Sequence, residues 1–292
     1  MKRYGILDIG TNTVHAAVYQ VEGTVFEKED SYAVWSPVPS NIQNGALSIE
    51  GIFALHKAIQ ELLAWFAKKG TDSVHIFATA SLRMVSNAQE VCAKIRELAG
   101  VDFCVLTGNE EAECDFLAMQ SAVHTTRGVG FDLGGGSMQV VEFANNNLIA
   151  AVSLPTGANR YWQQFVAGRR PARAELEAIY RAATAQLQKL PKMPCSRLYA
   201  MGGTAKRARK MLEILTGKPL KILRVPELQA LAGMPDFLEK AAGERYQTLT
   251  AGVVIITALC SHFKATDVQV LSCGVRDGYL QKLLDGKVQS GF

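Results

Sequence analysis

Two glycine-rich turns, each directly after an aspartate, carry the residue types that phosphate chemistry requires. The first reads Asp8-Ile-Gly-Thr-Asn-Thr13 and the second reads Asp132-Leu-Gly-Gly-Gly-Ser137. Glycine lets backbone N–H groups approach an anion with no Cβ in the way, and hydroxyl and amide side chains add further donors. An aspartate beside such a turn can hold Mg²⁺ through water, because that ion keeps part of its hydration shell. The turns therefore predict two phosphate clamps, with Asp8 and Asp132 as metal carboxylates.

The predicted phosphate donors of the two turns are Thr11, Asn12, Thr13, Gly134, Gly135, Gly136 and Ser137. A single Asp-x-Gly turn after a strand is more often a plain hairpin or a strand-to-helix connection. Neither turn is a P-loop, and neither matches the Gly-x-Gly-x-x-Gly pattern of a Rossmann dinucleotide site. It is the presence of two copies that favours phosphate binding.

The same order of elements occurs twice along the chain. Residues 4–35 and 129–153 each read as apolar strands joined by polar turns, which predicts two antiparallel meanders. Helices and strands alternate after each meander, including one helix predicted over 228–241 and a final helix over 277–285. The repetition predicts two α/β domains: the first comprises 1–123 plus 280–292, and the second comprises 124–279. We expect the ligand to bind between them and the domains to close on it about a hinge. The last helix is expected to pack back on the first domain.

Composition narrows the class of protein. The 292 residues carry a net charge of +4, which favours a local anion pocket over a nucleic-acid footprint. The N-terminus shows no signal-peptide pattern, and we find no apolar run of about 18 residues. We therefore expect a cytoplasmic protein with no membrane partner. The six cysteines form no Cys-x-x-Cys pair, which predicts buried thiols and not metal ligands or disulfides.

Seven motifs together resemble one known family. They are Asp8-Ile-Gly-Thr-Asn-Thr-Val-His15, Ala78-Thr-Ala-Ser-Leu-Arg-Met84, Thr107-Gly-Asn-Glu-Glu-Ala112, Asp132-Leu-Gly-Gly-Gly-Ser137, Ser153-Leu-Pro-Thr-Gly157, Gly202-Gly-Thr-Ala205 and Ser272-Cys-Gly-Val-Arg-Asp-Gly278. In this order they are similar to the exopolyphosphatase/guanosine pentaphosphate phosphohydrolase (Ppx/GppA) family of the actin-like ATPase superfamily. The resemblance implies a two-domain actin-like ATPase (ribonuclease H-like) fold, with duplicated halves and a central cleft. It also implies Mg²⁺- or Mn²⁺-dependent release of terminal phosphate from polyphosphate or guanosine pentaphosphate. Whether the protein forms a homodimer is left open.

The motif at 107–112 supplies the candidate for the catalytic carboxylate. Hydrolysis of a phosphoanhydride needs a group that positions the attacking water and accepts its proton. By resemblance one of Glu110 and Glu111 has this role; we favour Glu110 and keep Glu111 as the alternative. The other interpretation is that both residues only open a helix, where acidic side chains complement the helix dipole.

Further candidate contacts follow from the other motifs. Arg83 is predicted to grip phosphate, because its guanidinium can bind two oxygens at once. Gly202, Gly203 and Thr204 open a helix and offer N–H donors to an anion. The basic run at 206–210 is either the margin of a substrate channel or a solvated face.

Three positions depart from the family pattern. His15 is included among the phosphate contacts although the family usually has arginine there, Gln139 replaces a usual glutamate, and the segment 40–44 lacks an arginine. These changes remove charges from the expected site. They leave two other hypotheses open: a non-catalytic sensor that binds polyphosphate or guanosine tetra- or pentaphosphate, and a kinase.

Overall fold

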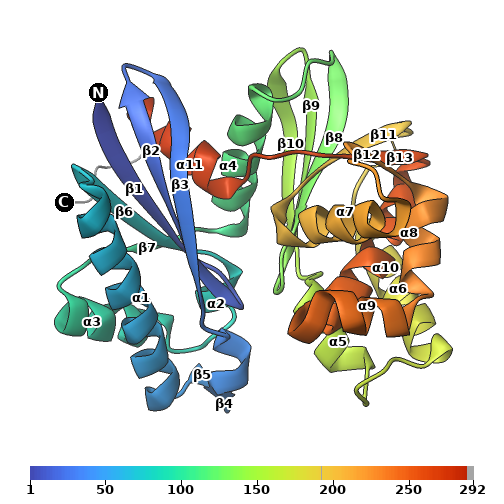
Figure 1. Cartoon of the computed structure of the whole chain (residues 1–292), viewed down its shortest axis with the longest axis horizontal. Helices are drawn as coiled ribbons and strands as arrows, with labels where there is room; N and C mark the ends of the chain where they lie inside the picture. Colours follow the sequence, from blue (N-terminus) through green and yellow to red (C-terminus); the bar gives the residue numbers. More distant parts are fainter. Residues whose placement is uncertain (192, 288–292) are drawn as a thin grey trace. The chain divides into compact units, whose positions relative to one another are not determined.

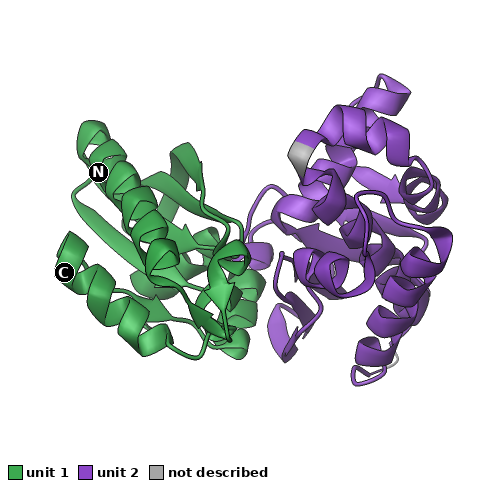
Figure 2. Cartoon of the chain, turned by 90° about the horizontal axis from the view of Figure 1, so that it is seen from below, with its two compact units in different colours: residues 1–117, 275–292 green, residues 118–274 purple. Residues whose placement is uncertain are grey.

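The computed structural model describes residues 1–191 and 193–287 (Figure 1). The chain divides into two compact units, which Figure 2 shows in different colours. Unit 1 comprises Met1–Leu117 and Val275–Phe292, and unit 2 comprises Ala118–Gly274. The predicted domain limits, 1–123 plus 280–292 and 124–279, stay a prediction.

Unit 1 is built on a five-stranded sheet with the order β3-β2-β1-β6-β7. The strands are β1 (Lys2–Ile9), β2 (Thr13–Glu22), β3 (Val25–Trp35), β6 (Ser73–Ala78) and β7 (Cys104–Val105). The first three form an antiparallel meander, as predicted, while β6 pairs in parallel with both β1 and β7. Because parallel strands end at the same edge, β1 and β6 deliver the residues that follow them to one edge of the sheet.

The two faces of this sheet are buried by different helices, since successive strand residues point to opposite sides. Leu7 and Ile9 of β1 belong to the core that includes residues of α1 (Ile49–Lys69) and α3 (Ala88–Ala99). Ile6 lies in the opposite core, together with residues of α4 (Gly108–Gln120) and α11 (Val275–Leu284). Helix α11 therefore belongs to unit 1, and its N-terminal end is held against the sheet there. Short elements complete the unit: η1 (Val38–Asn41), β4 (Ile42–Gln43), β5 (Ala46–Leu47) and α2 (Ala80–Arg83).

Unit 2 repeats this topology. Its six-stranded sheet has the order β10-β9-β8-β11-β13-β12. The strands are β8 (Arg127–Leu133), β9 (Met138–Ala144), β10 (Asn147–Leu154), β11 (Arg197–Met201), β12 (Ile222–Arg224) and β13 (Asp267–Val270). Strands β8, β9 and β10 form an antiparallel meander, and β8, β11 and β13 are parallel neighbours. The predicted duplication is confirmed, with β12 as an additional edge strand.

The helices of unit 2 surround a long central helix. They are α5 (Ala158–Phe165), α6 (Arg173–Leu187), α7 (Gly202–Thr216), α8 (Val225–Ala232), α9 (Pro235–Ala242), η2 (Gly243–Arg245) and α10 (Tyr246–Phe263). Among the described residues, α10 alone is long and apolar enough to span a membrane, and 78% of that stretch is buried inside the protein. Its hydropathy is therefore accounted for by its place in the core of unit 2, where most of its residues pack.

Two sequence expectations were wrong. The single helix predicted over 228–241 is two helices, because Pro235 has no N–H to continue α8 and instead begins α9. All six cysteines are free thiols, but Cys104 is exposed and only Cys114 and Cys260 are buried. Cys104 lies on the two-residue strand β7, which is at the edge of the sheet in the part of the chain that the structure describes.

Candidate active site

The turn between β1 and β2 is fixed by its carbonyl groups. Thr11 O accepts a hydrogen bond from Val38 N at 2.9 Å, and Asn12 O accepts one from Ser36 N at 3.1 Å. A trans peptide unit points its N–H and C=O in opposite directions. The N–H of Asn12 is therefore directed away from the segment that holds the turn, as a phosphate donor must be.

The turn between β8 and β9 follows the same plan with different partners. Gly134 O accepts from Ala158 N, and Gly135 O accepts from Asn159 N and Arg160 N, all at 3.0 Å. These donors are the first N–H groups of α5, which begins after the Ser153–Gly157 motif. A Cβ on Gly157 would lie 2.3 Å from Gly135 O, so glycine is needed there for the close approach. The N–H groups of Gly135 and Gly136 consequently face away from α5.

Both aspartates lie opposite a polar residue on the neighbouring strand. Asp8 pairs in register with His15 across β1 and β2, and Asp132 pairs with Gln139 across β8 and β9. Residues that are directly opposite in an antiparallel pair point to the same face, with Cβ atoms about 5 Å apart. Two of the three departures, His15 and Gln139, thus lie opposite the two predicted metal carboxylates, one in each unit.

Helix α11 brings an arginine to the first aspartate. Asp8 is 7% exposed, and its Oδ2 lies 3.4 Å from Arg276 Nη1. The next residue, Asp277, accepts a hydrogen bond of 3.2 Å from the Tyr19 hydroxyl, and burial together with Asp277 raises the pKa of Tyr19. Sequence reasoning did not assign Arg276 a role. The signal was available, because Arg276 lies inside the Ser272–Gly278 motif.

Gly202 allows the start of α7 to lie against the second aspartate. Gly202 has φ +80°, and a Cβ on it would be 2.0 Å from Asp132 Oδ1. Thr204 is 7% exposed, and its methyl group packs where a Cβ on Gly252 of α10 would be, 2.2 Å away. The structure thus brings Gly202 to Asp132, while the Thr204 side chain packs against α10. Phosphate binding by Gly202, Gly203 and Thr204 stays a prediction.

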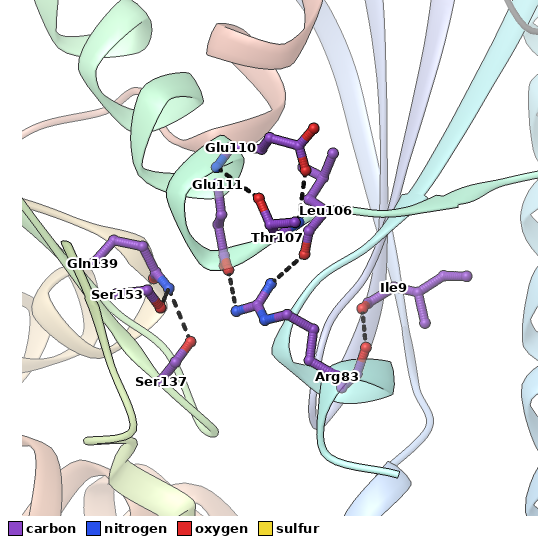
Figure 3. A network of polar contacts seen from close by, with 10 residues as sticks. Ile9, Arg83, Leu106, Thr107, Glu110, Glu111, Ser137, Gln139 and Ser153 are labelled. Atoms are coloured by element: carbon purple, nitrogen blue, oxygen red, sulfur yellow. Dashed lines mark hydrogen bonds and ion pairs between the residues drawn. The ribbon is translucent and has the colours of Figure 1, made fainter. Parts of the chain in front are cut away.

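The two candidate carboxylates at the start of α4 have different surroundings (Figure 3). Glu110 forms a capping box with Thr107: Thr107 N donates to Glu110 Oε2 at 2.7 Å, and Glu110 N donates to Thr107 Oγ1 at 3.2 Å. The backbone N–H of Thr107 lowers the pKa of Glu110, against a smaller opposing effect of burial. Glu110 therefore has a structural role at the helix start.

Glu111 points instead to Arg83 (Figure 3). Its Oε2 accepts from Arg83 Nη2 at 2.6 Å, and Arg83 Nη1 donates to Leu106 O at 2.7 Å. The Glu111 residue is 8% exposed, so this ion pair is largely shielded from water. The predicted phosphate contact of Arg83 stays a prediction; the contacts in unit 1 show that Arg83 fixes the carboxylate of Glu111.

Comparison with known proteins places the chain in a family. Residues 40–287 match the Ppx/GppA phosphatase family. The chain belongs to this family. Its sequence is 25% identical to exopolyphosphatase 1 of Mycobacterium leprae, over 98% of this chain and 90% of that one. For exopolyphosphatase 1 of Mycobacterium tuberculosis the identity is 23%, over 98% and 89% of the two chains.

Solved structures agree in fold with this Ppx/GppA phosphatase. An exopolyphosphatase from Cytophaga hutchinsonii superposes with a TM-score of 0.86, at 19% identity and 98% coverage of both chains. The Ppx/GppA family member of Aquifex aeolicus gives a TM-score of 0.80, at 19% identity and 99% coverage of both chains. The expected two-domain actin-like ATPase fold and the expected hydrolase class are both confirmed.

The basic run on α7 divides into residues with different partners. Lys206 Nζ donates to the carbonyl oxygens of Ser272 at 2.8 Å and Cys273 at 3.1 Å, and Arg209 Nε lies 3.8 Å from Glu213. Arg207 forms no ion pair with the part of the chain that the structure describes. Lys206 and Arg209 are thus tied to the protein, whereas Arg207 and the exposed Lys210 have charge to offer an anion.

The charge of a second arginine, Arg245, acts on Arg207. Burial, and to a smaller extent the positive charge of Arg245, lowers the pKa of Arg207 to about 10. Two guanidinium groups that repel each other in a partly buried place are stabilised when an anion binds between or beside them. The pair was not predicted from the sequence, because Arg245 lies on η2, far along the chain from the run on α7.

Asp8 and Asp132 suit a metal ion that keeps most of its water ligands better than one that is held by protein ligands alone. Within the described residues, no group of three or more His, Cys, Asp or Glu side chains is arranged to hold a metal. Mg²⁺ is commonly bound by one or two carboxylates plus substrate phosphates, with water completing its octahedron. Single aspartates such as Asp8 and Asp132, each beside a predicted phosphate turn, are consistent with that mode.

Proposed function

We propose that this Ppx/GppA phosphatase releases terminal phosphate from inorganic polyphosphate or guanosine pentaphosphate, with Mg²⁺ or Mn²⁺ as cofactor. The observation that carries the proposal is the ion pair in unit 1 between Glu111 and Arg83. The ion pair provides a carboxylate near the start of α4 that is shielded from water and held in a fixed orientation. The similarity to curated exopolyphosphatases over nearly the whole chain supports polyphosphate as the substrate.

Glu111 is our preferred residue for directing the attacking water. A general base must keep a fixed orientation and be able to accept a proton, and the Arg83 guanidinium provides the orientation. Glu110 is less suited, because its Oε2 is occupied in closing the first turn of α4. The preference thus moves from the first glutamate of the pair to the second, on the basis of contacts that the sequence does not reveal.

The remaining roles follow from charge and donor geometry. Asp8 and Asp132 would hold the metal, which when bound neutralises charge on the phosphoryl oxygens. The turn donors Thr11, Asn12, Thr13, Gly134, Gly135, Gly136 and Ser137 would bind phosphoryl oxygens, and His15 is included with them. Arg207 and Arg245 would add an anion contact for a further phosphate of the substrate. Preorganised donors of this kind stabilise developing charge without reorganising during the reaction.

A non-catalytic sensor is the second candidate, and one observation favours it. The residues opposite the two aspartates are His15 and Gln139, where the resemblance leads us to expect arginine and glutamate. A site with fewer charges can still bind a polyanion through backbone donors while turnover is slow. The sensor would bind polyphosphate or guanosine tetra- or pentaphosphate and release no phosphate.

A panel of substrates separates the candidates. Short and long polyphosphate, guanosine pentaphosphate and nucleoside triphosphates are incubated with the protein and Mg²⁺, and free phosphate is measured. We expect release from polyphosphate or guanosine pentaphosphate. Binding of either without release would establish the sensor, and transfer of labelled phosphate to a small acceptor would establish a kinase.

Replacing the predicted metal carboxylates should raise the metal requirement. Asp8→Asn and Asp132→Asn are each expected to shift the Mg²⁺ midpoint of activity upward by about tenfold or more, because a neutral amide is a poorer ligand for a hard cation. Activity is titrated with Mg²⁺ for both variants and for Asp236→Asn, an exposed aspartate on α9, as the control. Unchanged midpoints in both site variants would remove these carboxylates from metal binding.

Restoring a permanent charge opposite Asp8 should tighten substrate binding. His15→Arg is expected to lower the KM for a short polyphosphate at pH 8 by roughly tenfold, the scale of one charge-assisted hydrogen bond. Arginine keeps its charge at this pH, whereas histidine is charged only when protonated. His124→Arg adds the same charge at an exposed position and is the matched control. An equal gain in both variants would mean that only net charge matters and that His15 does not contact the substrate.

A further inference from the structure

A buried amide in unit 2 links two serine hydroxyls (Figure 3). Gln139 on β9 is 2% exposed, and its Nε2 donates to Ser137 Oγ and to Ser153 Oγ, both at 2.9 Å. Ser137 ends the glycine turn, and Ser153 lies on β10, directly opposite Gln139 in the strand register. The amide thus joins the phosphate turn to the third strand of the meander.

The direction of these hydrogen bonds decides what the hydroxyls can do. An amide NH₂ has two N–H donors, and here each is directed to one serine oxygen. A hydroxyl oxygen that accepts a hydrogen bond keeps its own proton for a different acceptor. A carboxylate at position 139 would do the opposite, since it could only accept the serine protons. Glutamine at position 139 therefore does not take up the proton of either serine.

We propose that Gln139 is a positioning residue that orients the Ser137 hydroxyl as a hydrogen-bond donor to a phosphoryl oxygen of the substrate. The proposal rests on the proposed function of the site. Gln139 itself does not need to touch the substrate, because it is buried beneath the turn and opposite Asp132. In this chain the turn then binds phosphate with one more oriented donor and one less negative charge than a glutamate would give.

A double-mutant cycle tests the coupling between the two residues. Ser137→Ala is expected to weaken binding of tripolyphosphate by roughly tenfold, because it removes one hydrogen bond to a charged group. Gln139→Leu should weaken binding by about fivefold in the wild-type background, since the hydroxyl is then no longer oriented, and by less than twofold in the Ser137→Ala background. The non-additive result is the expected signature of a residue that acts through Ser137.

Binding is measured by calorimetry in EDTA, so that turnover and metal affinity do not enter, and KM and kcat are measured separately with Mg²⁺. Gln139→Leu should raise KM by about the factor by which it weakens binding, and should change KM and kcat by less than twofold in the Ser137→Ala background. Thr257→Val removes another buried side-chain hydrogen bond of unit 2, on α10, and controls for a general loss of stability. It should not change binding.

Two outcomes would overturn the proposal. If Gln139→Leu binds like the wild type, or if its loss is equally large in the Ser137→Ala background, Gln139 does not orient Ser137. These results leave the proposed function intact, provided the wild type binds tripolyphosphate and releases phosphate. A wild type that neither binds nor hydrolyses polyphosphate or guanosine pentaphosphate would overturn the proposed function, and the positioning role with it.

Discussion

Glu111→Gln is expected to lower kcat for phosphate release by at least about 100-fold, the scale of losing a general base. Glutamine has nearly the same shape as glutamate, and its side-chain oxygen can still accept the hydrogen bond that Arg83 Nη2 donates to Glu111 at 2.6 Å. The amide, however, cannot take the proton of the attacking water. We therefore expect KM to stay within a few-fold of the wild type while kcat falls. Initial rates over a range of polyphosphate concentrations separate the two parameters.

Glu110→Gln is the matched control for this prediction. Glutamine can close a capping box as glutamate does, so the Thr107 N contact at 2.7 Å should be retained. The variant is expected to keep kcat within a few-fold of the wild type. A large loss in Glu110→Gln together with full activity in Glu111→Gln would reverse the assignment, and full activity in both would remove the pair from catalysis.

Gly278→Ala is expected to destabilise unit 1 by about 3 kcal/mol, at the upper end of ordinary overpacking. A Cβ on Gly278 of α11 would lie 1.6 Å from the carbonyl oxygen of Cys114 in α4. Backbone cannot rotate out of the way as a side chain can, so one of the two helices must shift. For a protein of this size the expected fall in thermal midpoint is roughly 6–12 °C.

Gly274→Ala, in the same motif, is the control, because a Cβ there would meet no atom within 4 Å. Thermal unfolding of the two variants is compared, together with the Mg²⁺ midpoint of activity. The thermal midpoint should fall in Gly278→Ala alone, and the Mg²⁺ midpoint should fall with it, since a shifted α11 moves the positive charge of Arg276 away from Asp8. Equal melting curves for the two variants would show that α11 and α4 do not pack as closely as described.

The fold could be predicted from the sequence because its signals are local and occur twice. Each aspartate turn lies between two apolar strands, and each half continues with alternating helices and strands, so topology and duplication follow from pattern alone. The helix over 228–241 was predicted wrongly because apolar periodicity continues on both sides of Pro235 while the backbone does not. The short edge strand β12 carries too few residues to show a period.

The candidate site could be predicted as a set of positions but not as a set of contacts. The motif at 107–112 shows two adjacent glutamates, and which of them caps α4 and which meets Arg83 depends on packing between segments far apart in sequence. Arg276 reaches Asp8 because α11 returns to unit 1. Similarly, the composition of the α7 run does not reveal that Lys206 is held by the carbonyl oxygens of Ser272 and Cys273.

We propose that this Ppx/GppA phosphatase is a metal-dependent hydrolase of phosphoanhydrides. The most direct test is a time course of phosphate release from long-chain polyphosphate by the wild-type protein, with Mg²⁺ and with EDTA. We predict steady release with Mg²⁺ and none with EDTA, together with progressive shortening of the chain from its ends. No release with Mg²⁺ or Mn²⁺ from polyphosphate or guanosine pentaphosphate, by a protein that nevertheless binds them, would contradict the claim and leave a sensor in its place.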